Sequence, residues 1–140
     1  MKKLLLVAAF ICAYFTSFAQ QKTEIKSQYL LIVRFKTDFK PATDSTISVN
    51  IKHWQVYMGG LAQSGKIAVG YRPSGDGITI SGTQKTTTNT PYTANNDVLS
   101  SILIINADDL NDAKTIAAKC PALELGGSVE VRPIMNTAGK

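Results

Sequence analysis

The apolar positions of the chain fall into two kinds of run, one with the period of a strand and one with the period of a helix. The runs QYLLIVRF, at positions 28–35, and DVLSSILIIN, at 97–106, carry apolar side chains at both odd and even positions. Successive side chains of a strand point to opposite faces, so each run predicts a strand covered on both faces. A shorter run, GGSVEVRPI at 126–134, predicts the last strand.

Two segments have the helical period instead. From 45 to 64, apolar residues recur at steps of three and four, which predicts an amphipathic helix with Asp44 or Ser45 as its N-cap and Gly65 at its end. The stripe expected to face the core consists of Ile47, Ile51, Trp54, Met58 and Leu61.

The segment after the second two-sided strand predicts another helix. Asp108 or Asp109 is suited to cap its start, and Pro121 is suited to end it. Its expected core stripe consists of Leu110, Ala113, Ala117 and Cys120.

The pattern is weaker in the middle of the chain. KIAVGYR at 66–72 and GITISG at 77–82 are short strand-like runs, and the Pro, Ser, Gly and Asp residues between them suit a hairpin turn. The stretch TQKTTTNTPYTANN at 83–96 has no apolar period, which predicts a long exposed loop.

The predicted order is strand, helix, strand, strand, helix, strand, which is that of a ferredoxin-like α+β fold with an antiparallel four-stranded sheet. Right-handed crossovers place both helices on one face of that sheet. The other face then carries large aliphatic side chains, in a patch larger than a soluble monomer usually exposes. We therefore expect a homodimer in which two such sheets pack face to face.

The N-terminus begins with Lys2 and Lys3, continues with an apolar run to about Phe15, and then has Ser17-Phe18-Ala19, with a small residue at either end of this tripeptide. This is the pattern of a secretory signal peptide at 1–19, which predicts an exported protein, periplasmic or secreted, without stable membrane anchoring. The alternative is an uncleaved anchor helix, for which the apolar run is short. The rest divides into a linker at 20–27, a domain at 28–136 and a tail at 137–140.

Composition bears on the partners. Without Lys2 and Lys3, 13 of the 15 basic residues remain against 10 acidic ones, a mild net charge of +3. These cations are scattered, so no nucleic-acid partner is expected. Loss of the leader leaves Cys120 as the only thiol, either buried or reactive, and its place before Pro121 favours burial. One histidine and one cysteine do not supply the usual ligands of a metal site, and no motif indicates a cofactor.

Three stretches of the chain resemble one known family. DDLNDAKTIAAKCP followed by GGSVEVRPI is similar to the C-terminal half of the YCII-related (DGPF-domain) family, and WQVYMGGLAQSGKIAVGYRP is similar to its first helix and second strand. The resemblance covers nearly the whole chain after the leader. It implies a ferredoxin-like subunit, a dimeric α+β barrel and a biochemical function that is mostly unassigned.

The chain departs from this family at the motif that gives the family its name. Where the family has Asp-Gly-Pro-Phe, this chain has Ser81-Gly82-Thr83-Gln84, and Asn95-Asn96 stands where Lys-Glu is usual. The role of those family residues is therefore not carried over to this chain.

His53, the only histidine, is the candidate catalytic residue. Some proteins similar to this family place a histidine on the first helix and pair it with an aspartate, so the resemblance implies an acid/base role for His53. A neutral-range pKa suits histidine to proton transfer when an acid orients it. The alternative is a partly exposed His53 at the edge of the helix face, beside Trp54.

The last strand offers candidate ligand-binding residues. If the two valines of GGSVEVRPI pack under the helices, Glu130 and Arg132 face the space between two sheets, where Arg34 of the first strand joins them. Guanidinium grips a carboxylate in two places, so these residues, with Tyr71 or Tyr29 near the mouth, suit a small anionic or polar molecule. The alternative is a set of structural ion pairs between strands.

Three functions remain open on this basis. The main one is an exported homodimer of non-enzymatic or unassigned function that binds a small polar or anionic molecule. The second is a cofactor-independent enzyme, an isomerase, lyase or hydrolase that uses His53 as acid and base. The third is a structural or interaction domain in which the Thr- and Asn-rich loop contacts a partner.

Overall fold

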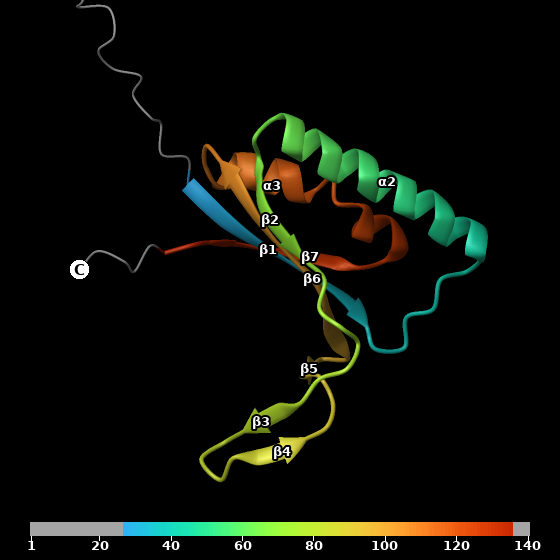
Figure 1. Ribbon diagram of the computed structural model, residues 1–140, viewed down its shortest axis with the longest axis vertical. Coiled ribbons are helices and arrows are strands. Elements are labelled where there is room, and N and C mark those ends of the chain that lie inside the picture. The colour runs from blue at the N-terminus through green and yellow to red at the C-terminus, as the bar shows by residue number, and fades with distance from the viewer. Residues whose placement is uncertain (1–26, 136–140) are drawn as a thin grey trace, which may run out of the picture.

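The computed structural model describes residues 27–135 (Figure 1). The predicted leader at 1–19 and the predicted tail at 137–140 lie outside the described residues. The elements in chain order are β1 (Ser27–Lys36), α2 (Asp44–Gln63), β2 (Ile67–Tyr71), β3 (Thr79–Ser81), β4 (Thr86–Thr88), β5 (Thr93–Ala94), β6 (Asp97–Ala107), α3 (Leu110–Ala117), the 3-10 helix η2 (Pro121–Leu125) and β7 (Ser128–Pro133).

The main sheet has the strand order β2-β6-β1-β7, and every neighbouring pair is antiparallel. β5 adds to it by pairing with β6. The two strands that are apolar on both faces, β1 and β6, occupy the centre, where each has a neighbour on either side. The structure confirms the predicted ferredoxin-like α+β fold.

The main hydrophobic core lies between the sheet and its two helices. Tyr29 and Leu31 of β1 pack in one cluster with Leu103 and Ile105 of β6. The helices contribute Leu61, Ala113, Ile116 and Ala117 to the same cluster, with Trp54, Tyr57 and Met58 partly buried against it. Both helices therefore lie on one face of the sheet, as predicted.

The opposite face of the sheet is also aliphatic. β1 and β6 are paired so that Leu30 lies beside Ile104 and Ile32 lies beside Ile102. Because side chains alternate along a strand, these four point away from the core, and all four are only partly buried. We call the surface made by Leu30, Ile32, Ile102 and Ile104 the open sheet face.

The N-cap of α2 is Thr43. Its backbone is extended, and its hydroxyl accepts a hydrogen bond from the Thr46 N–H at 3.1 Å. The prediction of Asp44 or Ser45 was wrong, because several consecutive residues here have side chains able to cap a helix and only the backbone geometry selects among them.

The end of α2 lies where the sequence predicts it. Gly65 takes the left-handed conformation, with φ at +64°. The N–H of Lys66 donates to the Leu61 carbonyl at 2.8 Å, and the N–H of Gly65 donates to the Ala62 carbonyl at 3.1 Å. These two bonds form a Schellman motif, which satisfies carbonyls that the helix leaves free.

The predicted core stripe of α2 is buried only toward its C-terminal end. Leu61 is buried and Trp54 and Met58 are partly buried, whereas Ile47 and Ile51 keep 36% and 51% of their surface exposed. The expectation for these two isoleucines was wrong, because a cleft separates the N-terminal half of α2 from the sheet.

Asp109 caps α3, since its carboxylate accepts a hydrogen bond from the Asp112 N–H at 2.8 Å. Of the predicted stripe, Ala113 and Ala117 are buried. Leu110 is exposed, contrary to expectation, because it is the first residue of the helix and Ile116 fills the core instead.

Cys120 is buried, with 2% of its surface exposed, as the sequence predicts. Burial raises the pKa of its thiol, which disfavours the reactive thiolate. The chain does not pass directly to the last strand after Pro121, because it first forms η2, an element that the sequence analysis does not anticipate.

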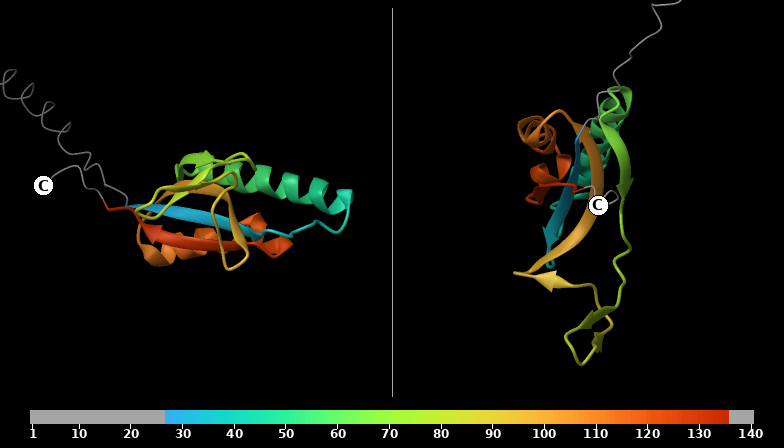
Figure 2. Two further views of the ribbon diagram at one scale, coloured as in Figure 1. Left: turned by 90° about the horizontal axis from the view of Figure 1, so that it is seen from below. Right: turned by 90° about the vertical axis from the view of Figure 1, so that its left-hand side faces the viewer.

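The middle of the chain differs from the prediction. The runs expected to pair as a hairpin do not pair with each other: β2 joins β6 in the main sheet, and β3 pairs with β4 in a separate two-stranded sheet. The expected exposed loop at 83–96 therefore contains β4 and β5. We call residues 72–92 the arm, because this segment extends beyond the end of the main sheet (Figures 1 and 2).

The turn between β5 and β6 has a sequence signal in its two asparagines and not in any apolar period. Asn95 and Asn96 have φ values of +53° and +62°, and they connect a strand pair in which Ala94 lies opposite Asp97. A two-residue hairpin loop of this kind favours asparagine, which tolerates positive φ better than most residues.

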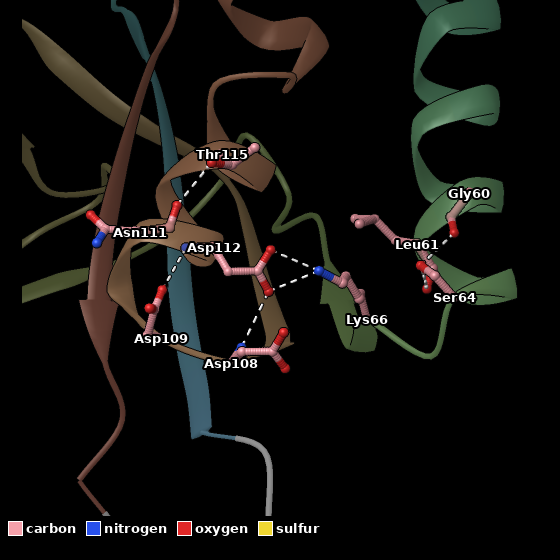
Figure 3. Close-up of polar contacts among 9 residues, drawn as sticks. All are labelled: Gly60, Leu61, Ser64, Lys66, Asp108, Asp109, Asn111, Asp112 and Thr115. Carbon is pink, nitrogen blue, oxygen red and sulfur yellow. Dashed lines mark hydrogen bonds and ion pairs between the residues drawn. The ribbon is translucent and has the colours of Figure 1, made fainter.

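An ion pair fixes the start of α3 against the start of β2 (Figure 3). The Lys66 ammonium lies 2.7 and 2.8 Å from the two carboxylate oxygens of Asp112. The Asp108 N–H donates to the same carboxylate at 3.2 Å. The hydrogen bond to Asp112 raises the pKa of Lys66, so the ammonium is charged throughout the neutral range.

Candidate functional site

Three of the predicted ligand-binding residues meet in one cluster beside the open sheet face. The Arg34 guanidinium contacts the Glu130 carboxylate through Nη1 at 2.7 Å. Arg132 contacts the other oxygen of Glu130 through Nε. Strand register explains the arrangement, because Glu130 lies opposite Ile32, and Arg132 lies opposite Leu30, so these charged side chains share the face of those aliphatic neighbours.

The cluster carries a net positive charge at neutral pH. The hydrogen bond from Arg132, and to a smaller extent that from Arg34, holds the pKa of Glu130 below its usual value, so this carboxylate is ionised at neutral pH. One carboxylate is thus shared by two guanidinium groups. Each guanidinium has five N–H donors, so both retain donors for a further acceptor.

His53 does not lie in this cluster. Its Nδ1 is 2.8 Å from Oε2 of Glu124 in η2, and both side chains are half exposed. Asn50, buried one helical turn earlier in α2, donates from Nδ2 to the same Glu124 oxygen at 3.1 Å and to the Pro121 carbonyl at 2.8 Å. The hydrogen bond from His53, reinforced by that from Asn50, holds the pKa of Glu124 below its usual value.

This arrangement has the elements of an acid/base pair. Glu124 orients the imidazole through Nδ1, which leaves Nε2 as the nitrogen able to exchange a proton with another molecule. The sequence alone does not indicate Glu124, because it lies in η2, an element without an apolar period.

An open cleft of about 1700 Å³ lies between the N-terminal half of α2, the arm and β6. Two predicted ligand-binding residues, Arg34 and Tyr71, line it, whereas Glu130, Arg132 and His53 are not among its lining residues. The cleft also exposes Arg72, which the sequence analysis does not single out. The structure therefore places the predicted site residues at the open sheet face, at the cleft and at the contact between α2 and η2.

Within residues 27–135, no group of three or more His, Cys, Asp or Glu side chains is arranged to hold a metal ion. A search of the same residues finds no helix that combines the length and the apolar character needed to span a membrane.

An antiparallel sheet in the order β2-β6-β1-β7, with both helices on one face, defines a protein of the ferredoxin-like α+β class. Within this class the sequence identifies the family. A model of the YCII-related domain family matches residues 28–138, and the chain belongs to this family. A search of curated proteins finds no significant match.

Proposed function

We propose that the protein is an exported homodimer that binds a small polar or anionic molecule without transforming it. The observation that carries this proposal is the cluster of Arg34, Glu130 and Arg132, which places a net positive charge beside an aliphatic surface. A charged group next to apolar side chains is the usual composition of a small-molecule site.

A second copy of the chain is the proposed cover of the open sheet face. Its four aliphatic side chains lie in the two central strands and are partly exposed in the single chain. Each Å² of apolar surface removed from water contributes about 25 cal/mol. Packing two such faces together buries this surface and encloses the arginine cluster between the sheets.

The ligand is held in this proposal by guanidinium donors that Glu130 does not use. Arginine recognises carboxylate and phosphate groups through two parallel hydrogen bonds. Arg132 is the better anchor of the two, because more of its side chain is exposed than of Arg34.

The proposed export rests on the leader-like sequence at 1–19, where Lys2 and Lys3 precede an apolar run that ends in small residues near Ala19. Detection of the protein, shortened by this segment, outside the cytoplasm of the producing cell tests this part of the proposal. Full-length protein confined to the cytoplasm would contradict it.

A thermal-shift screen against small organic acids tests the binding function. We expect at least one carboxylate to raise the melting temperature, and Arg132→Gln to abolish that shift, because the substitution removes the guanidinium. Lys85→Gln, in the exposed arm, is the matched control and should retain the shift. Absence of any stabilising acid in a broad panel argues against the proposal.

The pairing of His53 with Glu124 at 2.8 Å favours one second candidate, a cofactor-independent isomerase, lyase or hydrolase. In this alternative His53 exchanges the proton and Glu124 positions the imidazole. Once a reaction is detected, His53→Ala should reduce kcat by at least about 100-fold, the usual contribution of general acid/base catalysis. A folded His53→Ala variant with undiminished activity rules this candidate out.

A further inference from the structure

The apolar stripe of α2 is buried at its C-terminal end and exposed at its N-terminal end. Apolar residues on the core stripe of a helix normally contact a sheet or another helix. At the C-terminal end of α2 they do, since Leu61 belongs to the main core. Ile47 and Ile51 lie on the same stripe, yet both are exposed and both line the cleft. This half of the stripe thus leaves apolar surface exposed to the cleft.

The cleft continues this apolar surface. Trp54 and Met58 of α2 line it on one side, and Phe39 lines it from the loop that joins β1 to α2. Pockets for small molecules usually have volumes of roughly 300–1,000 Å³. At about 1700 Å³ and open to solvent, this cleft has room for a molecule with a substantial hydrocarbon or aromatic body.

The charged residues that line the cleft differ in whether they have an ion-pair partner. They are three cations and two carboxylates, Arg34, Lys36, Arg72, Asp76 and Asp97, which leaves a net positive charge. Arg34 is paired with Glu130 at 2.7 Å, and Lys36 is paired with Asp97 at 2.9 Å. The Arg72 guanidinium makes no ion pair or hydrogen bond within residues 27–135. Of the three cleft cations, Arg72 alone has no ion-pair partner among these residues, so all of its donors are open to an anion from solution.

We propose that the cleft binds an organic anion with a large apolar body, such as a carboxylate on an aromatic ring system or on a long aliphatic chain. The body packs on Ile51 and Trp54, and Arg72 holds the anionic group. This inference deepens the proposed binding function, on which it rests, by naming the class of ligand and by adding the α2 side of the molecule to the site.

The chain carries its own reporter for this site. Trp54 is the single tryptophan of the sequence, and it lines the cleft. Titration with 1-naphthoate and with decanoate, followed by tryptophan fluorescence, tests for binding next to this residue. Succinate, a polar dicarboxylate, serves as the comparison ligand, and thermal shift measures its binding independently of Trp54.

Two pairs of variants locate the bound ligand. Ile51→Asp places a charge on the apolar wall, and its control is Val56→Asp, a residue of the same helix that is 75% exposed and not among the lining residues. Arg72→Gln removes the free cation, and its control is Lys52→Gln on the exposed side of α2. We expect Ile51→Asp and Arg72→Gln each to weaken naphthoate binding about tenfold or more, and the controls to leave it unchanged.

The outcomes separate this inference from the proposed function. Naphthoate binding that Ile51→Asp and Arg72→Gln weaken, and that Arg132→Gln spares, supports the cleft. Succinate binding that Arg132→Gln abolishes, without any binding of naphthoate or decanoate, overturns the cleft and supports the arginine cluster. Naphthoate binding that Ile51→Asp does not change also overturns the cleft. Absence of binding by all three acids contradicts both proposals.

Discussion

At the scale of single residues, Asn50 has the contacts of a structural support. It is buried in α2, and its amide donates to the Pro121 carbonyl and to Glu124. These bonds connect α2 to η2, an element more than 70 residues later in the chain. A hydrogen bond between segments so far apart leaves no periodic signal, so no sequence pattern indicates the role of Asn50.

We expect Asn50→Ala to lower the free energy of unfolding by about 1–3 kcal/mol, because it removes the hydrogen bonds that the buried amide donates to the Pro121 carbonyl and to the Glu124 carboxylate. Chemical denaturation measures the change. Lys52→Ala, two residues away and exposed, is the control and should change stability by less than about 0.5 kcal/mol. Equal stability of the two variants would mean that Asn50 is not the link between α2 and η2.

The pair of His53 and Glu124 gives a pH prediction. The folded protein holds the pKa of Glu124 below the value of the unfolded chain, which is about 4.3. The contact therefore contributes stability above that value, and this contribution is lost as the pH falls through the folded pKa of Glu124. Because the hydrogen bond from His53 is the largest cause, His53→Ala should move the pKa of Glu124 upward.

Carbon-13 NMR titration of the Glu124 carboxyl measures this shift in the wild type and in His53→Ala. The pKa of Glu130 is the internal control, because Arg132 and Arg34 lower it and His53 does not contact it. A Glu124 titration that is identical in the two proteins would show that the pair does not persist in solution.

Residue-level prediction succeeds where a single strand sets the side-chain direction. The alternation of GGSVEVRPI places Glu130 and Arg132 on one face, and the structure joins them to Arg34. The side-chain direction of the cleft residue Arg72 could not be predicted in this way. Arg72 lies just after the end of β2, where the chain enters the arm, so strand alternation no longer applies to it.

At the scale of secondary structure, the first turn of α2 provides a direct test. The hydroxyl of Thr43 accepts the hydrogen bond that the Thr46 N–H would otherwise lack. Thr43→Ala should lower the free energy of unfolding by about 1 kcal/mol, whereas Ser45→Ala, inside the helix, should have a smaller effect. Thermal or chemical denaturation compares the two variants. A greater loss in Ser45→Ala would favour the cap that the sequence analysis suggested.

The elements that bury a continuous apolar pattern could be predicted from the sequence, whereas β4, β5 and η2 were missed and β3 was predicted with the wrong partner strand. β1, β6 and both helices carry such patterns because each contributes to the main core. β3, β4 and β5 have at most three residues each and lie outside this core. Their threonines favour extended backbone, but these strands contribute no residue to the core, so no apolar pattern marks them in the sequence. The 3-10 helix η2 is likewise too short for a period.

At the scale of the whole molecule, the open sheet face predicts the oligomeric state. If two copies pack through this face, Ile32→Asp should weaken the dimer at least about tenfold, because it places a charge among buried aliphatic side chains. Ile80→Asp, on the exposed arm, is the control and should remain dimeric. Light scattering at micromolar concentration gives the mass of each protein. A wild type of monomeric mass excludes this arrangement.

Both ends of the arm attach to one edge of a single strand. β2 ends where Tyr71 pairs with Ile102, and β5 begins where Thr93 pairs with Val98. At about 3.4 Å per residue, these two points on β6 are about 14 Å apart, a gap that a short turn spans. The segment between them is therefore free to lengthen, shorten or change composition during evolution while the strand order of the sheet and the packing of both helices are preserved.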